Sequence, residues 1–129
     1  MTAADFFDAL WTHYAIVTPQ ASAIHKLFES EGERVVNDHV AFRTFNIAGY
    51  GLDSANRILN ELGYCVFESY VFPKKFLRAN AFMVPDDLQA PKIFFSELQI
   101  ESLSLQAQAI ILDMTENVHA DLVLSLIHI

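Results

Sequence analysis

The fold is decided by the stretch Asn37-Asp38-His39-Val40-Ala41-Phe42-Arg43-Thr44-Phe45. From His39 onward its side chains follow the period of two that is typical of a β-strand with one covered face. The alternation defines two sets of side chains, His39, Ala41, Arg43 and Phe45 on one face and Val40, Phe42 and Thr44 on the other. We expect the second set to lie beneath a helix, which leaves a histidine and an arginine together on the open face.

The residues before this strand have helical periodicity. Apolar residues recur every three or four positions in two segments, which predicts helices within residues 3–31. Thr18 is a favourable N-cap and Pro19 a favourable first residue for the second helix, which should end near Gly32. The chain therefore opens with a helical lead-in.

The residues after the strand alternate between helical and strand-like patterns. Gly49 and Gly51 mark a loop, a helix is expected over 52–62, and Gly63 is its stop signal. Proline-containing turns then separate three predicted strands, 64–71, 78–84 and 92–99. A last helix is expected over 103–116.

The predicted fold class is α+β, a helical lead-in followed by one βαβββ module over residues 37–100. Such a module forms an open, twisted sheet with a helix on its back, so its concave face needs a second module to close it. Pairs of these modules form the metal-binding cup of vicinal-oxygen-chelate proteins. One module is present here, so we expect half of such a cup.

Composition excludes several classes of function. Sixteen acidic residues against eight basic ones give a formal net charge of −8, with the densest basic spot at Lys74-Lys75 and nearby Arg78. This charge disfavours binding to nucleic acid. No secretory signal is visible, and charge interrupts every apolar run before the roughly 18 residues of a membrane span. We expect a cytoplasmic protein that does not enter the membrane.

His39 and Arg43 are the candidate functional residues. A strand rises about 3.3 Å per residue, so their Cα atoms should lie about 13 Å apart, with room between the side chains for a small dianion. Neutral imidazole is a favoured ligand of divalent iron, and a guanidinium grips a carboxylate with two hydrogen bonds. From spacing alone, a structural histidine and an ordinary ion-paired arginine remain the alternatives.

Three segments carry a resemblance to a known family: NDHVAFRTF at 37–45, LWTHYAIVTPQASAIHKLF before it and PKIFFSELQIESLS after it. Over about residues 10–117 the chain resembles the 2-oxoadipate dioxygenase/decarboxylase family, most closely its shorter bacterial members. The resemblance implies that His39 binds the catalytic Fe²⁺ and that Arg43 contacts the substrate. The intact enzyme would convert a 2-oxo dicarboxylate such as 2-oxoadipate to a 2-hydroxy acid, with uptake of O2 and release of CO2.

The remaining ligands of that family, a histidine and a glutamate, belong to the second half of its fold. Nothing after Asn117 resembles either segment, and His119 and His128 lack the surrounding motif. The resemblance therefore implies the N-terminal part of a longer enzyme, inactive by itself. Other metal-dependent lyase or hydrolase chemistry on the same cup, or a small metal-binding module that dimerises, are the alternatives. The oligomeric state stays open.

Glu97 is a further candidate metal ligand. It alternates with Ile93, Phe95 and Gln99, so it could face the same interior as His39. A role as polar partner of Arg43 or of another buried group is the alternative that the sequence favours. His13, His25 and Asp38 are given structural roles, the first two on the lead-in helices and Asp38 as a cap or brace of the strand.

The end of the chain has a different character. Residues 124–129, LSLIHI, match the translation of a sequencing-adapter end, so we expect a domain over 1–123 and a non-biological tail over 124–129.

Overall fold

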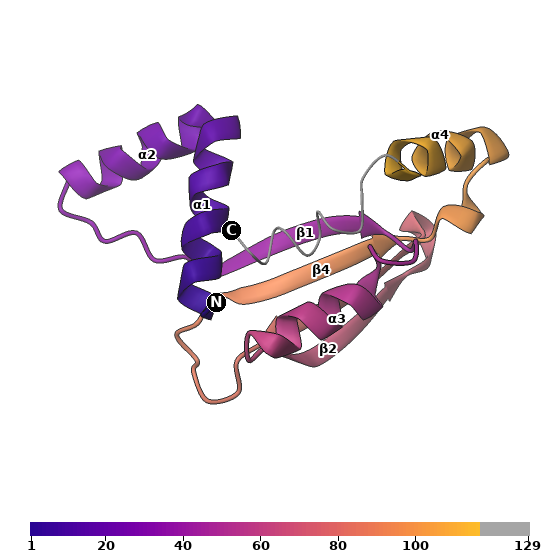
Figure 1. Cartoon of the computed structure of the whole chain (residues 1–129). Coiled ribbons are helices and arrows are strands. Elements are labelled where there is room, and N and C mark those ends of the chain that lie inside the picture. The colour runs from indigo at the N-terminus through magenta and orange to yellow at the C-terminus, as the bar shows by residue number, and fades with distance from the viewer. Residues whose placement is uncertain (117–129) are drawn as a thin grey trace. The chain divides into compact units, whose positions relative to one another are not determined.

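A computed structural model describes residues 1–116 of the chain, and these residues form two compact units, 1–37 and 38–116 (Figure 1). The helices are α1 (Ala3–Val17), α2 (Pro19–Ser30), α3 (Leu52–Glu61) and α4 (Leu105–Glu116), with short 3-10 helices η1 (Pro73–Lys75) and η2 (Ile100–Ser102). The strands are β1 (His39–Phe45), β2 (Cys65–Phe72), β3 (Leu77–Met83) and β4 (Lys92–Leu98). His119, His128 and the tail 124–129 lie outside the described residues.

The first unit is a pair of helices. Thr2 and Asp5 form a capping box, in which the Asp5 backbone N–H donates to Thr2 Oγ1 and the Thr2 backbone N–H donates to the Asp5 carboxylate. Thr18 ends α1 and precedes Pro19, the first residue of α2, as predicted. Its hydroxyl makes no capping hydrogen bond to α2, and its backbone N–H closes α1 on the Tyr14 carbonyl at 2.8 Å.

The second unit is a four-stranded mixed sheet with the strand order β1-β4-β3-β2. β1 pairs with β4 in parallel, and the other two pairs are antiparallel. The chain therefore leaves β1, crosses through α3 to the far edge of the sheet at β2, and returns strand by strand until β4 lies beside β1 (Figure 1). This is the predicted βαβββ unit.

Helix α3 covers one face of that sheet and creates its core. Its buried residues are Leu52, Ala55 and Leu59, and the fully buried Phe82 and Ile93 belong to the core on the sheet. Gly63 ends the helix with φ of 87°, a left-handed conformation that glycine adopts without steric cost.

Tyr64, which follows Gly63, joins the end of α3 to the turn before β4. It is 1% exposed, and its hydroxyl donates to the Pro91 carbonyl at 2.7 Å. Burial, with a smaller contribution from Asp87, raises the pKa of Tyr64 to about 12.

The N-terminus of α3 is held by a residue of β4. Glu97 is 5% exposed, and one of its carboxylate oxygens accepts a hydrogen bond from the Leu52 backbone N–H at 2.8 Å. A carboxylate at this place satisfies a free N–H and complements the positive end of the helix dipole. A Cβ at position 51 would lie 2.7 Å from the same oxygen, so a side chain there would displace the carboxylate.

The expectation that Glu97 shares a face with His39 is wrong. In the parallel register Glu97 is paired with Thr44, whereas Arg43 is paired with Ser96, so Glu97 lies on the face that α3 covers. Its other contacts are Gln99 at 3.0 Å and the Arg78 guanidinium at 3.8 Å. The structural alternative, a polar partner for a buried group, is the arrangement observed, although the partner is not Arg43.

The other predicted helices and strands are confirmed, and most of their ends differ from the prediction by no more than two residues. No local pattern predicted η1, η2 or the irregularity between Val66 and Glu68, where the pairing of β2 with β3 shifts register. Among the described residues, no helix combines the length and the apolar character that a membrane crossing needs.

Replacing Glu97 should destabilise the sheet–helix unit. Glu97→Ala leaves the buried Leu52 N–H without an acceptor and should lower the free energy of unfolding by about 2 to 3 kcal/mol. Glu97→Gln keeps an acceptor oxygen and should cost about 1 kcal/mol. Urea denaturation of the 129-residue chain measures both. The control is Glu61→Ala, at an exposed position of α3. An equal loss of stability in Glu61→Ala and Glu97→Ala would contradict the role of Glu97 as the cap of α3.

Candidate metal and substrate site

The face of the sheet opposite α3 carries the two residues that the sequence singled out. Strand β1 has exposed side chains at His39, Ala41 and Arg43, whereas Val40, Phe42 and Thr44 are half-buried. Phe42 stacks on Phe95 of β4 with ring centroids 5.4 Å apart, on the covered side. The predicted two-faced strand is therefore present, with His39 and Arg43 on its open face.

His39 begins β1 and is paired with a carboxylate. Its Nδ1 lies 2.9 Å from Oδ2 of Asp38, and both side chains are largely exposed. An ionised carboxylate only accepts hydrogen bonds, so the neutral imidazole donates through Nδ1–H and keeps its lone pair on Nε2. The hydrogen bond from His39, and secondarily the charge of Lys92, hold the pKa of Asp38 below its ordinary value. The carboxylate is thus ionised near neutral pH.

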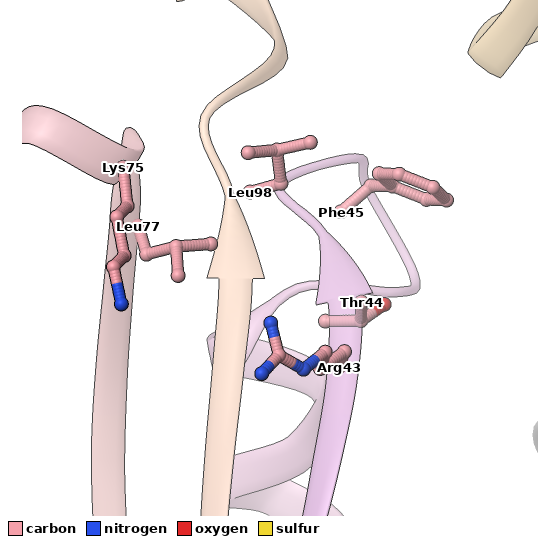
Figure 2. A pocket seen from close by; sticks show the side chains of 6 residues that line it. All are labelled: Arg43, Thr44, Phe45, Lys75, Leu77 and Leu98. Atoms are coloured by element: carbon pink, nitrogen blue, oxygen red, sulfur yellow. The ribbon is translucent and has the colours of Figure 1, made fainter. Parts of the chain in front are cut away.

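Arg43 lines a pocket at the other end of the same face. The pocket has a volume of about 360 Å³ and is bounded by residues of β1, β3, β4 and η1: Arg43, Thr44, Phe45, Lys75, Leu77 and Leu98. Figure 2 shows the Arg43 guanidinium extending from β1 across β4, with Lys75 on the opposite wall. Phe45, Leu98 and Leu77 are neighbours across three strands and form an apolar row between the two cations.

The pocket has an excess of positive charge. Within residues 1–116 neither Arg43 nor Lys75 forms an ion pair with a carboxylate, whereas Arg78 is engaged with Glu97 on the opposite face. The alternative of an ordinary ion-paired Arg43 is therefore not what the described residues show. Two unpaired cations above an apolar row can bind an anion that has an aliphatic part.

The donor set for a metal is incomplete in the described residues. They contain no group of three or more His, Cys, Asp or Glu side chains placed to hold a metal ion. His39 fits as one ligand, because its Nε2 is free and its side chain is exposed on the open face. A complete site would need ligands from beyond residues 1–116. His13 lies exposed on α1, and His25 contacts Trp11 and Glu29 within the helix pair.

Lys75 was missed as a candidate site residue. The sequence showed it as part of the densest basic spot, directly after Pro73, and the proline marked only a turn. What brings Lys75 to Arg43 is the pairing of β3 with β4 and of β4 with β1, which is a long-range property.

Comparisons with known proteins identify the family to which the chain is similar. A family model described as 2-oxoadipate dioxygenase/decarboxylase matches residues 5–128. A protein of that name from Oryza sativa subsp. japonica, labelled chloroplastic/amyloplastic, is 38% identical over 108 residues, which are 76% of this chain and 30% of the relative. Its chloroplastic namesake from Arabidopsis thaliana is 35% identical over 116 residues, 81% of this chain and 31% of the relative. The chain thus spans about a third of the length of these relatives.

Solved structures are similar to this chain in fold and in sequence. A Shewanella frigidimarina protein described as a candidate hydrolase superposes with a TM-score of 0.84 at 36% identity, over 94% of this chain and 47% of that one. The hydroxyglutarate synthase of Oryza sativa, solved in complex with 2-oxoadipate, gives 0.76 at 34% identity, over 84% and 38%.

A third structure bears on the fold alone. A Ralstonia eutropha protein described as a candidate member of the glyoxalase superfamily gives a TM-score of 0.72 at 24% identity, over 80% of this chain and 34% of that one. The expected α+β, vicinal-oxygen-chelate-like fold class is confirmed by these neighbours. The family model, which matches residues 5–128, shows that the chain belongs to the 2-oxoadipate dioxygenase/decarboxylase family.

Proposed function

We propose that this chain supplies one module of an Fe²⁺-dependent dioxygenase that decarboxylates a 2-oxo dicarboxylate such as 2-oxoadipate. The observation that carries the proposal is the placement of His39 and Arg43 on one open face, in a chain of this family. The reaction balances as one 2-oxo dicarboxylate and one O2 giving one CO2 and a 2-hydroxy acid that is one carbon shorter.

The bound iron would supply the redox chemistry with O2, for which zinc is unsuited because it has no accessible redox change. His39 would hold the ion through Nε2, at the beginning of β1. Since the described residues provide one ligand, we propose that the remaining ligands lie outside them and that this module by itself does not turn over substrate.

Arg43 would orient the substrate. A planar guanidinium forms two parallel hydrogen bonds to a carboxylate, which fixes direction as well as position. The apolar row of Phe45, Leu77 and Leu98 would exclude water from the aliphatic part of the substrate. Binding and orientation are therefore the tasks of this end of the module.

Asp38 would act as a positioning residue for His39. A carboxylate that accepts from one ring nitrogen fixes the tautomer and the ring orientation, which makes the other nitrogen a better ligand. The lowered pKa of Asp38 keeps its carboxylate ionised, and able to accept this hydrogen bond, at neutral pH.

The enzymatic assignment is tested in the intact enzyme that carries this module. His39→Ala should abolish stoichiometric iron binding and O2 consumption with 2-oxoadipate. Arg43→Lys should retain iron but lower kcat/KM by about 10- to 100-fold, because the two-pronged hydrogen bond is lost. Arg57→Lys, at an exposed position of α3 on the covered side, is the matched control and should change neither quantity. Undiminished O2 consumption in His39→Ala would refute the assignment.

The alternative reactions are separated by the same preparation. A metal-dependent lyase or hydrolase continues without O2, whereas the proposed oxygenase stops. The Shewanella frigidimarina structure, described as a candidate hydrolase, makes this control worth performing. A self-dimerising metal module would instead appear as a stable dimer of the 129-residue chain with bound metal, in size-exclusion chromatography followed by metal analysis.

The role of Asp38 has a readout that requires no metal. In ¹⁵N NMR spectra at alkaline pH, where imidazoles are neutral, His39 should carry its proton on Nδ1. Asp38→Ala should remove this bias, and in the intact enzyme it should weaken iron binding by about tenfold or more. Asp86→Ala, at an exposed turn, should leave the His39 spectrum unchanged. A wild-type His39 protonated on Nε2 would contradict the proposed orientation.

A further inference from the structure

The pocket beside Arg43 contains a second cation, and the iron-binding role of His39 does not account for it. Lys75 and Arg43 line the same cavity of about 360 Å³ from different elements, η1 and β1. Lys74, which precedes Lys75 in the chain, is also exposed but does not line the cavity. The two lysines therefore differ in position although they are adjacent in sequence.

The backbone around Lys75 is anchored to the sheet. Phe76, the next residue, has φ of 53°, a left-handed conformation that reverses the chain after η1. Its N–H donates to the Pro73 carbonyl at 3.2 Å, and its carbonyl accepts from the Gln99 N–H at 2.7 Å. The second bond ties the loop to the residue that follows β4. The backbone beside Lys75 is thus held at the wall of the pocket.

The position of the pocket along β1 indicates which part of a substrate it holds. His39 is in register with Lys92 at one end of the β1–β4 pair, and Phe45 is in register with Leu98 at the other. The pocket involves the last positions, Arg43, Phe45 and Leu98, and so lies at the end remote from His39. A ligand group in this pocket is the group farthest from a metal held by His39.

We propose that Lys75 and Arg43 together bind the distal carboxylate of the substrate, with Lys75 selecting dicarboxylates over monocarboxylates. The geometry supports this reading because both cations lack a carboxylate partner within residues 1–116, and the row between them is apolar. The assignment of this carboxylate as the distal one rests on the proposed function, because the distance is counted from a metal held by His39. The carboxylate-binding pair itself is independent of that function.

The pair is tested first without metal or turnover, in the 129-residue chain with glutarate as the probe. Glutarate should shift the methyl NMR signals of Leu77 and Leu98. Lys75→Gln should weaken glutarate binding by about two- to fivefold, the range of a solvent-exposed charge pair, and added salt should weaken it further. Lys74→Gln is the matched control and should leave the affinity unchanged. Equal losses in the two variants, or no shift of the pocket methyl groups, would overturn the proposal.

The selectivity is tested in the intact enzyme. Lys75→Gln should raise KM for 2-oxoadipate by a similar factor with kcat unchanged, because the contact is made equally in the ground and transition states. KM for 2-oxohexanoate, which has the same chain length but no distal carboxylate, should stay the same. A KM that rises equally for both substrates would refute the selectivity. An enzyme that turns over neither substrate, combined with Lys75-dependent glutarate binding, would contradict the proposed reaction but not the carboxylate pair.

Discussion

The hydrogen bond from the Leu52 N–H to the Glu97 carboxylate, 2.8 Å long and almost fully buried, is the contact on which the two-faced sheet depends. It joins the first turn of α3 to the end of β4, and a side chain at position 51 would displace the carboxylate. Once α3 is fixed to this side, alternation along β1 sends His39 and Arg43 to the other. The cap therefore lies on the covered face, and His39 and Arg43 lie on the other face.

The two faces of the sheet show which predictions the local sequence allowed and which it did not. Alternation within β1 and within β4 was readable from local sequence, and it grouped Glu97 correctly with Ile93 and Phe95. Which face of β4 corresponds to which face of β1 is set by the pairing register, and Glu97 is in register with Thr44 rather than Arg43. A register between strands separated by fifty residues leaves no local pattern. The carboxylate was thus assigned to the wrong side of the sheet although its strand was predicted correctly.

The place of Lys75 in the site could not be predicted from local sequence either. Its side chain type and its position after Pro73 were visible, but these describe a basic turn on an acidic protein. The pocket arises because β4 is inserted between β1 and β3 and because the Gln99 N–H holds the Phe76 carbonyl. By contrast, His39 and Arg43 belong to one continuous strand, so their relation was predictable from spacing alone. Residues that share an element can be grouped from sequence, and residues that meet through the sheet cannot.

The sheet also gives the proposed site a length scale. The described residues place a polar end at His39, with Asp38 and Lys92 beside it, and a cationic end with an apolar row at Arg43 and Lys75. The strand between them fixes the separation of the His39 and Arg43 Cα atoms at about 13 Å, and each side chain covers part of it. The net charge of −8 does not cancel the local field, because screening limits charge interactions across the surface to about 8 Å at physiological ionic strength. On the proposed function, one end of the substrate binds a metal held by His39, and the carboxylate at its other end binds in the pocket. A rigid strand then makes chain length, as well as charge, a property that the enzyme can discriminate.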